Sequence, residues 1–521
     1  MGKLLKQFFK VKSLTSIIKD SENPEKRLKK VLGPLDLILL GIGVIIGAGI
    51  FATVGTAAAG DAMRPGAGPA LIVSFAITAV VCGFAALCYA ELASLVPISG
   101  SAYTYSYATF GEIVAWMIGW DLMLEYVVGA IAVSISWSGY FVSLLQGFGI
   151  SLPAWSIIDF RSAIAGSSKA AILLDGGTPI EKLNPGLQIA LNALQGAPHI
   201  FGVPIIFNLP AVVIILLLTI LLVIGIKESL RFNMAIVLVK LLVLGFFIAV
   251  GAFFVKPHNW VPFAPNGFAG IKAGAAIAFF AYIGFDVIST AAEETKDPER
   301  NMPIGIIGSL AICTLIYMAV AAVFTGIIPF NFLKDSLAHQ KAEPLALAMQ
   351  YINLNWAAGI VAVGAVMAQI AVLLALLMGQ SRIFFSMARD GLLPKVFSRV
   401  HHAFKTPYVT TVLTGLIVAI FAAFTNIEEM VDLTNIGTLF AFVLVCIGVV
   451  ILRAKEPGRK RDFKVPFSPY VPLFGAAACF FLMTALPTIT WYRFFIWLII
   501  GLVVYFSYGM HHSLMNKKRA R

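Results

Sequence analysis

The chain has 521 residues, of which 59% are hydrophobic and only 12% carry a formal charge. Soluble domains are about 45 to 50% apolar and about 25% charged, so this chain has too little polar surface for a water-soluble globule and is predicted to lie in a membrane. The same numbers exclude a disordered, collagenous, coiled-coil or small disulfide-bonded protein. The net charge of +12 does not indicate a nucleic-acid partner, because the charges lie in short gaps between long apolar runs.

Residues 1–30 contain nine Lys or Arg and no apolar core, so they do not resemble a cleavable signal peptide. We expect a cytoplasmic basic segment, either resting on the anionic inner leaflet or simply solvated. Twelve apolar runs long enough to cross a bilayer follow. The predicted spans are 35–57, 70–95, 113–145, 209–227, 232–255, 270–292, 304–328, 355–386, 409–426, 434–453, 470–488 and 492–512.

The distribution of basic residues predicts the orientation. With both termini on one side, 28 Lys and Arg fall in the inner gaps and tails and nine in the outer gaps. This bias predicts a multi-pass protein of the cell membrane whose N- and C-termini are cytoplasmic, with a second basic segment at residues 513–521. One outer connection, residues 146–208, is too long for a turn, and we expect a short surface helix around Leu187–Leu194 within it.

The first span contains four glycines in nine residues, Gly41, Gly43, Gly47 and Gly49. Gly43 and Gly47 could serve helix packing as a pair of small residues. Alternatively, the glycines mark an unwound segment whose backbone faces a ligand, because irregular backbone at membrane depth is tolerated only in protein or beside a cavity. A second interruption favours the latter interpretation.

That second interruption lies five spans later, in the run from Phe279 through Gly284 to Asp286. Interrupted helices at corresponding positions of two five-helix halves indicate a transporter with inverted repeats and a site at mid-membrane. Free N–H groups at a half-helix N-terminus suit a carboxylate, and free carbonyl groups suit an ammonium. The two interruptions therefore predict a zwitterionic ligand, an amino acid.

Charged residues inside a bilayer are functional candidates by default. Lys240 and Glu125 lie too deep in their spans to reach water, so each is a candidate for proton coupling unless an internal salt bridge or hydrogen bond explains it. Glu91 and Asp286 lie nearer the inner ends, where an interfacial or gate-locking role is expected. Asp121 shares a helix face with Glu125, so one of the two is expected to be protonated or separately partnered.

The remaining reactive side chains show no enzymatic pattern. The five cysteines all lie in apolar runs without metal-ligand spacing, so we expect buried thiols. None of the seven histidines lies in the interior of a span, which excludes a membrane-embedded histidine relay. We therefore predict no metal site, no cofactor and no enzymatic activity. A channel is disfavoured because two inverted interruptions do not build a ring-shaped filter.

Several motifs together resemble a known family. They are Gly41–Phe51, Cys88–Leu92, Pro97–Tyr103, Phe280–Asp286, Glu293–Glu294 with Pro298 and Pro303, and Arg382–Pro394 followed by Pro407. These motifs resemble those of the amino acid-polyamine-organocation transporters, and within that superfamily the bacterial members of the cationic amino acid transporter family. The resemblance extends from about residue 30 to residue 512.

The resemblance implies an all-α polytopic fold of twelve transmembrane helices, with a 5+5 inverted repeat and two peripheral helices. The first repeat would comprise residues 31–255, the second 256–453 and the peripheral helices 454–512. Two features depart from the family. Eukaryotic cationic transporters have fourteen helices, and the outer loop 146–208 is longer than expected for a bacterial member.

The resemblance also implies roles for particular residues. The substrate carboxylate would meet the backbone of Ile45, Ile46, Gly47, Ala48, Gly49 and Ile50, and the ammonium would meet carbonyl groups near Phe280, Ala281 and Ile283. Glu125 would lie near the side-chain pocket, and Leu376 would limit side-chain size. Lys240 matches a lysine linked to proton coupling, and we expect Asp286 to pair with Arg382 and Arg389 at a cytoplasmic gate.

These features predict a secondary active transporter that takes up an L-amino acid with a proton by alternating access. A bulky Leu376 and the absence of a further carboxylate beside it or Ala48 favour small neutral substrates such as alanine. The alternatives are an exchanger without net proton coupling and a dedicated arginine or lysine transporter. A small membrane-protein partner is not determinable from the sequence.

Overall fold

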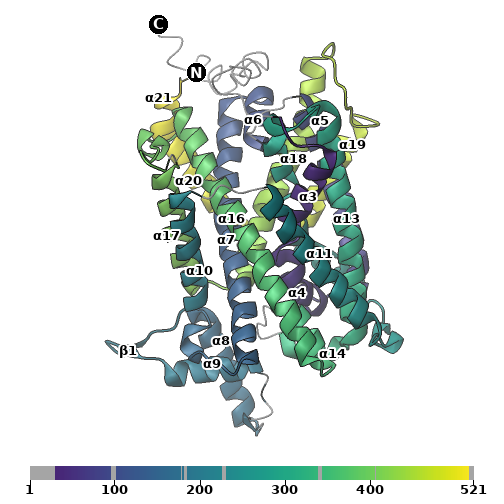
Figure 1. Cartoon of the computed structure of the whole chain (residues 1–521), viewed down its shortest axis with the longest axis vertical. Coiled ribbons are helices and arrows are strands. Elements are labelled where there is room, and N and C mark those ends of the chain that lie inside the picture. The colour runs from purple at the N-terminus through teal and green to yellow at the C-terminus, as the bar shows by residue number, and fades with distance from the viewer. Residues whose placement is uncertain are drawn as a thin grey trace.

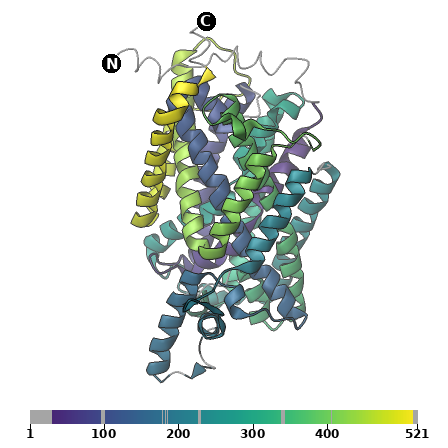
Figure 2. The same ribbon diagram turned by 90° about the vertical axis from the view of Figure 1, so that its left-hand side faces the viewer.

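The computed structural model describes residues 30–95, 101–177, 179–180, 183, 185–225, 230–337, 343–404 and 406–514. The predicted basic segments 1–30 and 513–521 lie almost entirely outside these residues, as does the start of the Pro97–Tyr103 motif. The described chain is helical apart from one short hairpin. Its long helices share one axis and form a single bundle (Figures 1 and 2).

The first half of the chain contains one interrupted and one short membrane helix, three long ones and, at residues 154–204, a group of small elements that we call the outer subdomain. Its elements are α3 (Pro34–Ile45), η1 (Gly49–Thr53), α4 (Val54–Ala59), η2 (Gly68–Ala70), α5 (Leu71–Leu95), α6 (Ser101–Thr109), α7 (Glu112–Gly147), η3 (Ala154–Ser156), α8 (Phe160–Asp175), α9 (Pro185–Gly196), β1 (His199–Ile200), β2 (Val203–Pro204), α10 (Leu209–Ile224) and α11 (Leu230–Ala252).

In the second half, all regular secondary structure of the described residues is helical. Its elements are η5 (Pro257–Trp260), α12 (Gly267–Ala278), η6 (Phe279–Tyr282), η7 (Phe285–Glu294), α13 (Pro298–Ile327), α14 (Phe330–Leu337), α15 (Pro344–Tyr351), α16 (Asn355–Arg389), η8 (Lys395–Ser398), α17 (Tyr408–Phe424), α18 (Ile427–Lys455), α19 (Tyr470–Met483), α20 (Thr488–Val504), η9 (Tyr505–Gly509) and α21 (Met510–His512).

Eight helical segments of the described chain are long and apolar enough to cross a membrane, and the bent pair α3 and η1–α4 makes a ninth. The predicted spans 209–227, 409–426 and 470–488 coincide with α10, α17 and α19, which are apolar but have only 14 to 17 residues. The membrane character of the chain is thus confirmed. The total of twelve spans and the inverted repeat stay predictions.

The core lies at the middle of the bundle, where α7 packs against α16 and α18, and α5 against α13. These helices bury one continuous apolar cluster, whereas the outer subdomain has two small clusters of its own. All five cysteines are buried, as predicted. The helices at the periphery, such as α10 and α17, instead expose large apolar side chains, which is expected of surfaces that face lipid.

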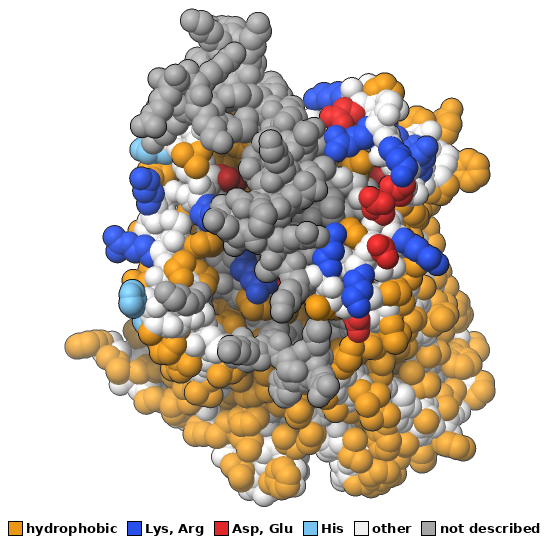
Figure 3. All heavy atoms as spheres, turned by 45° about the horizontal axis from the view of Figure 1, so that its top comes forward, with side chains coloured by type: hydrophobic (Ala, Val, Ile, Leu, Met, Phe, Trp, Pro, Cys, Tyr) orange, Lys and Arg blue, Asp and Glu red, His pale blue; other side chains and the backbone are white. Residues whose placement is uncertain are grey.

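The bundle has two distinct ends. The described C-terminal helix α21 lies at one end, which we call the inner end, and α8, α9 and the hairpin lie at the opposite, outer end (Figure 1). Lys, Arg, Asp and Glu side chains gather on the inner end, and hydrophobic side chains cover the wall below them (Figure 3). The outer connection contains α9 at Pro185–Gly196, so the helix predicted around Leu187–Leu194 is confirmed.

Candidate binding site

The first membrane helix is interrupted where its glycines predict. Helix α3 ends at Ile45, Ile46 is extended with ψ 97°, and helical structure resumes at Gly49 as a π-helical turn. The two halves are bent by 41° relative to each other. At two glycines of this segment, neighbouring atoms leave no room for a side chain. A Cβ on Gly47 would lie 2.9 Å from Cγ2 of Val372, and one on Gly49 would overlap the backbone of Ala281.

The second interruption lies at Ile283 and Gly284. Helix α12 continues into the 3-10 turn η6, after which Ile283 is extended and Gly284 has φ +117°. Residues with side chains rarely adopt that value, so only glycine allows the reversal without strain. The chain then continues as the 3-10 segment η7.

The two interruptions meet in space. Gly49 packs on the backbone of Ala281, and a Cβ on Gly284 would lie 2.7 Å from Cγ1 of Val44. At the inner end, the residues before α3 and after η7 are bonded, since Val31 N–H donates to the Glu294 carbonyl at 2.8 Å. The two interrupted helices therefore run antiparallel and cross at their breaks, so that their irregular backbones face the same space.

A small cavity of about 40 Å³ lies at this crossing. Its volume corresponds to the space of about three water molecules, because one water needs about 10 to 15 Å³ by the same measure. Both interruptions contribute to its wall, together with helices α7, α16 and α18. The lining residues are Val44, Ile45, Gly47, Ala48, Gly49, Glu125, Tyr126, Gly129, Val133, Phe280, Ile283, Gly284, Val287, Val372, Leu376 and Thr434.

Eight of the eleven predicted substrate-binding residues line this cavity. Ile46, Ile50 and Ala281 do not, because their side chains are fully buried in the surrounding core. Leu376 closes one side opposite Gly129, where a Cβ would come within 3.6 Å of the leucine Cδ1. The wall is mostly apolar, and Glu125 is its only charged side chain among the lining residues. The roles assigned to these residues stay predictions.

Three side chains donate hydrogen bonds to carbonyl groups at or beside the first interruption. Lys240 of α11 is fully buried, and its Nζ donates to the Gly43 carbonyl at 2.5 Å. The Tyr317 hydroxyl of α13 donates to the Ile45 carbonyl at 2.9 Å. The Tyr140 hydroxyl of α7 donates to the Phe51 carbonyl at 2.6 Å. Lys240 therefore forms a hydrogen bond to the interrupted helix, which is one of the two structural alternatives to proton coupling that the sequence left open.

A group of acidic side chains lies on the inner side of the cavity. Asp286, two residues after Gly284, is buried and lies near enough to Glu125 for the two carboxylates to interact. Asp121 is also fully buried, and within the described part of the chain neither of its carboxylate oxygens has a hydrogen-bond partner. The sequence predicted that Asp121 would differ from Glu125 in protonation or partner, and their surroundings do differ, because only Glu125 reaches the cavity.

The gate role assigned to Asp286, Arg382 and Arg389 stays a prediction. All three belong to the described residues, among which no ion pair joins Asp286 to either arginine. Both arginines are exposed, and Arg389 stacks over the ring of Phe385 at 5.7 Å. Asp286 is buried in the core, where its Oδ1 has no hydrogen-bond partner among the described residues.

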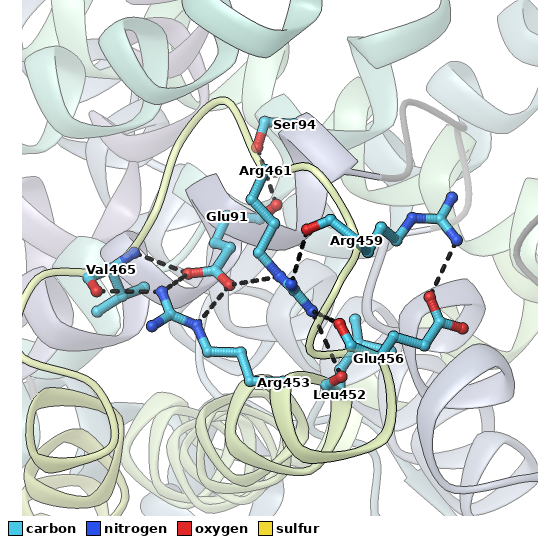
Figure 4. A network of polar contacts seen from close by, with 8 residues as sticks. All are labelled: Glu91, Ser94, Leu452, Arg453, Glu456, Arg459, Arg461 and Val465. Atoms are coloured by element: carbon cyan, nitrogen blue, oxygen red, sulfur yellow. Dashed lines mark hydrogen bonds and ion pairs between the residues drawn. The ribbon is translucent and has the colours of Figure 1, made fainter.

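The inner end is instead held by Glu91 of α5. Its carboxylate accepts hydrogen bonds from Nε and Nη2 of Arg453 at 2.9 and 2.5 Å and from the Val465 N–H at 2.7 Å. Arg461 Nε lies 3.4 Å from the same carboxylate and its Nη2 donates to the Glu456 carbonyl at 3.0 Å (Figure 4). The network ties α5 to the end of α18 and the loop that follows. The gate-locking role considered for Glu91 therefore has a structural basis.

A second ionic network lies at the outer end. Arg64, in the loop after α4, donates to Asp61 at 2.6 Å and to Asp432 of α18 at 2.8 Å. Burial alone would lower the pKa of the Arg64 guanidinium, but the carboxylates of Asp432 and Asp61 outweigh it and raise that pKa. Ionic contacts to α18 are thus present at both ends of the bundle. They come from the loop after α4 at the outer end and from α5 at the inner end.

Comparison with known proteins identifies the family. The sequence model described as amino acid permease matches residues 32–505. The chain belongs to the amino acid permease family. The predicted resemblance to amino acid-polyamine-organocation transporters is thereby confirmed.

Two relatives from Bacillus subtilis (strain 168) resemble the permease over nearly its full length. The permease is 45% identical to the "Methylthioribose transporter" over 516 residues, covering 98% of this chain and all of the relative. It is 46% identical to the "Branched-chain amino acid permease BcaP" over 509 residues, covering 98% and 99% of the two chains. The human "Cationic amino acid transporter 4" is 29% identical over 615 residues, covering 95% and 89%.

Sequence reasoning missed half of the cavity wall of the permease. Gly129 and Val133 follow Glu125 by one and two helical turns, and Val372 precedes Leu376 by one, so helical periodicity could have found them. Thr434 and Tyr126 carry no such signal, because their position depends on how α18 and α7 pack. The contact between Arg64 and Asp432 spans 368 residues and is likewise invisible to local patterns.

Proposed function

We propose that the permease is a secondary active transporter that takes up a small neutral L-amino acid together with a proton by alternating access. The observation that carries this proposal is the cavity at the crossing of the two interrupted helices, beside Glu125. Backbone N–H groups of η1 bind the substrate carboxylate, and carbonyl groups near Phe280 and Ile283 bind its ammonium. The apolar wall receives the side chain.

Cavity size and lining support a neutral substrate. The space of about 40 Å³ suits a small side chain, and Leu376 limits its length. The apolar lining also favours a second candidate substrate class, branched-chain amino acids, in line with the name of one relative. A dedicated arginine or lysine transporter has less support, because Glu125 is the single charged residue of the wall among the residues described.

Proton coupling is assigned to Lys240. Its buried amine bonds the Gly43 carbonyl, just before the interruption, so a change in its protonation would act directly on the backbone that binds substrate. The proposal places the protein in the cell membrane with both termini cytoplasmic, in agreement with the bias of basic residues toward the inner gaps. In this orientation the inner and outer ends of the bundle face the cytoplasm and the exterior.

The first experiment measures uptake of labelled alanine, leucine and arginine into proteoliposomes with an imposed pH gradient. We expect alanine uptake to follow the pH gradient and to ignore sodium. Uptake that requires sodium would contradict the proton coupling, and uptake that requires an internal amino acid would indicate an exchanger. A thermal-shift screen that includes methylthioribose tests the zwitterion site, since a ligand that binds only the folded state raises its melting temperature.

A variant of Lys240 tests the coupling residue. We expect Lys240→Met to reduce pH-driven alanine uptake by roughly ten- to hundredfold, because a charge-assisted hydrogen bond is worth about 1.5 to 3 kcal/mol. Counterflow of alanine without a gradient should be less affected. The matched control is Lys272→Met, since the Lys272 amine bonds Thr484 at 2.8 Å at the outer periphery. Full pH-driven uptake by Lys240→Met would disprove its role.

A further inference from the structure

The outer subdomain carries a hairpin whose tip is apolar and fully exposed. Strands β1 and β2 pair with His199 opposite Pro204 and Ile200 opposite Val203, so Phe201 and Gly202 form a two-residue turn. Phe201 is 101% exposed, and Ile200 and Val203 are more than half exposed. The hairpin extends sideways beyond α10 and α17 (Figure 1). Neither the proposed transport cycle nor the packing of the bundle uses these side chains.

The conformation of the turn does not explain why phenylalanine is present. Phe201 and Gly202 have φ values of +51° and +79°, as a type I′ hairpin turn requires. Asparagine, aspartate or glycine is preferred at the first of these positions, because a bulky side chain is strained at positive φ. The chain therefore holds a large apolar side chain at a position that disfavours it, where the side chain is fully exposed and packs against none of the described residues. Such strain is typical of residues retained for function.

The base of the hairpin fixes its level relative to the membrane. Asn208 N–H donates to the Ala423 carbonyl at the outer end of α17 at 3.1 Å, and the Asn208 side chain accepts from Ser138 of α7 at 2.7 Å. Helix α10 begins one residue later. Phe201 lies seven residues before Asn208, so an extended chain allows it a reach of roughly 20 Å along the membrane surface.

The chemistry of the segment matches a lipid surface. Residues 195–208 contain no Asp, Glu, Lys or Arg. The neighbouring outer turns of α10 and α17 expose Val213, Phe421 and Phe424, so the apolar tip continues a surface that already faces lipid. Aromatic side chains are enriched at the level where the bilayer meets water.

We propose that the tip of this hairpin, Ile200, Phe201 and Val203, inserts into the interfacial zone of the outer leaflet, with the lipids themselves as its partner. The hairpin thereby anchors the outer subdomain beside α10 and α17. The proposal requires a membrane-spanning bundle but does not depend on the transported substrate or on proton coupling.

A fluorescent probe at the tip tests this contact. Phe201→Cys is labelled with a polarity-sensitive thiol reagent and reconstituted into phosphatidylcholine and phosphatidylglycerol vesicles, with nitroxide lipids as quenchers. The unaltered chain is the labelling blank, because its five cysteines are buried. The matched control is Ile172→Cys, which is 70% exposed in the same subdomain. Arg161, near the start of α8, pairs with Glu429 of the bundle. Ile172 lies eleven residues further along the same helix, a distance of about 16 Å.

We expect the Phe201 probe to emit at shorter wavelength than the Ile172 probe and to be quenched several-fold more strongly by lipids with a shallow nitroxide. If the Phe201 probe is quenched by aqueous iodide as readily as the control and ignores nitroxide lipids, the tip lies in water and the proposal is wrong. Protection from both quenchers would indicate a protein partner, such as a second copy, and would equally overturn it.

A second variant separates lipid contact from a loosened hairpin. Asparagine tolerates the left-handed conformation better than phenylalanine, so Phe201→Asn should preserve or strengthen the turn. A probe at Val203→Cys should nevertheless lose several-fold in nitroxide quenching when Phe201→Asn is added, because the apolar anchor is gone. Unchanged quenching of the Val203 probe would show that Phe201 does not hold the hairpin at the bilayer.

Discussion

At the scale of single residues, Gly284 is decisive because two independent constraints apply to it. Its φ of +117° is closed to residues with side chains, and a Cβ would lie 2.7 Å from Val44, which lines the cavity. Most other glycines of a membrane bundle satisfy only one constraint, close approach of a neighbouring helix. The second interruption therefore tolerates no substitution at this position without movement of the first.

Gly284→Ala is predicted to destabilise the permease by roughly 1 to 3 kcal/mol and to abolish alanine uptake, because the strained backbone and the displaced Val44 both distort the cavity. The measurements are thermal unfolding in detergent and uptake in proteoliposomes. Gly83→Ala in α5 is the matched control. Open space surrounds Gly83, so this change should be neutral or stabilise by about 0.5 to 1 kcal/mol. Normal uptake by Gly284→Ala would refute the constraint.

Leu376 lines the cavity opposite Gly129, and its truncation is predicted to change substrate preference. Removing most of its side chain beside Gly129 enlarges the apolar wall. Leu376→Ala is predicted to raise leucine uptake relative to alanine by roughly tenfold, since an extra methylene or two in an apolar pocket is worth about 1 to 3 kcal/mol. The readout is the ratio of initial uptake rates.

The control for this change is Leu373→Ala on the same helix. Leu373 is fully buried but does not line the cavity, so its truncation should cost stability, about 2 to 5 kcal/mol, without altering the ratio of the two uptake rates. Equal ratios of leucine to alanine uptake in both variants would show that Leu376 does not determine substrate preference.

At the scale of elements, the interruption of the first helix is stabilised from outside the helix. Tyr317 of α13 satisfies the Ile45 carbonyl, and Lys240 of α11 satisfies the Gly43 carbonyl. Each freed backbone group buried in a membrane bundle costs stability unless it has such a partner. The interrupted helix is therefore a property of three packed elements rather than of its glycines alone.

Tyr317→Phe is predicted to lower stability by about 1 to 3 kcal/mol, because the Ile45 carbonyl loses its donor while the volume of the ring is unchanged. Thermal unfolding with and without saturating substrate measures the effect. Tyr470→Phe is the control, since Tyr470 is 70% exposed and its hydroxyl has no comparable partner to lose. A Tyr317→Phe variant as stable as the control would show that the carbonyl has another donor.

The sequence predicted the local features of the fold and missed the contacts between distant helices. Glycine spacing predicted both interruptions because backbone freedom is a local property, and apolar runs predicted the helices because each must cover about 30 Å of hydrocarbon. The partners of the freed carbonyls and the pairing of Glu91 with Arg453 could not be predicted, because they join helices hundreds of residues apart. The gate role of Asp286, Arg382 and Arg389 stays a prediction for the same reason, since the direction of a side chain depends on packing.

At the scale of the whole molecule, the cavity lies between two ionic networks. Glu91, Arg453 and Arg461 join α5 and α18 at the inner end, and Asp61, Arg64 and Asp432 join the loop after α4 to α18 at the outer end. Alternating access requires one end to open while the other stays closed. Because α18 takes part in both networks, breaking one of them should shift the population of conformations toward opening at that end.

The outer network allows a direct test of whether breaking an ionic network opens that end of the bundle. Arg64→Gln removes the only cation between Asp61 and Asp432 among the described contacts, so we predict that the permease opens outward and loses roughly 3 to 5 kcal/mol of stability. A cysteine at Val133, in the cavity wall, should then react several-fold faster with a membrane-impermeant thiol reagent added outside. Arg493→Gln is the control, because Arg493 pairs with Glu429 at the exposed rim.

The double variant Arg64→Gln with Asp432→Asn distinguishes opening from general unfolding. Removing both charges leaves no unpaired carboxylate at position 432, so stability should recover partly while the Val133 cysteine stays reactive from outside. If the reactivity of the Val133 cysteine instead decreases as stability recovers, the single variant had become reactive only because its fold was destabilised. The contact between Arg64 and Asp432 would then be a structural ion pair, and the outer closure of the cavity would have to reside in the apolar contacts around Phe280 and Thr434.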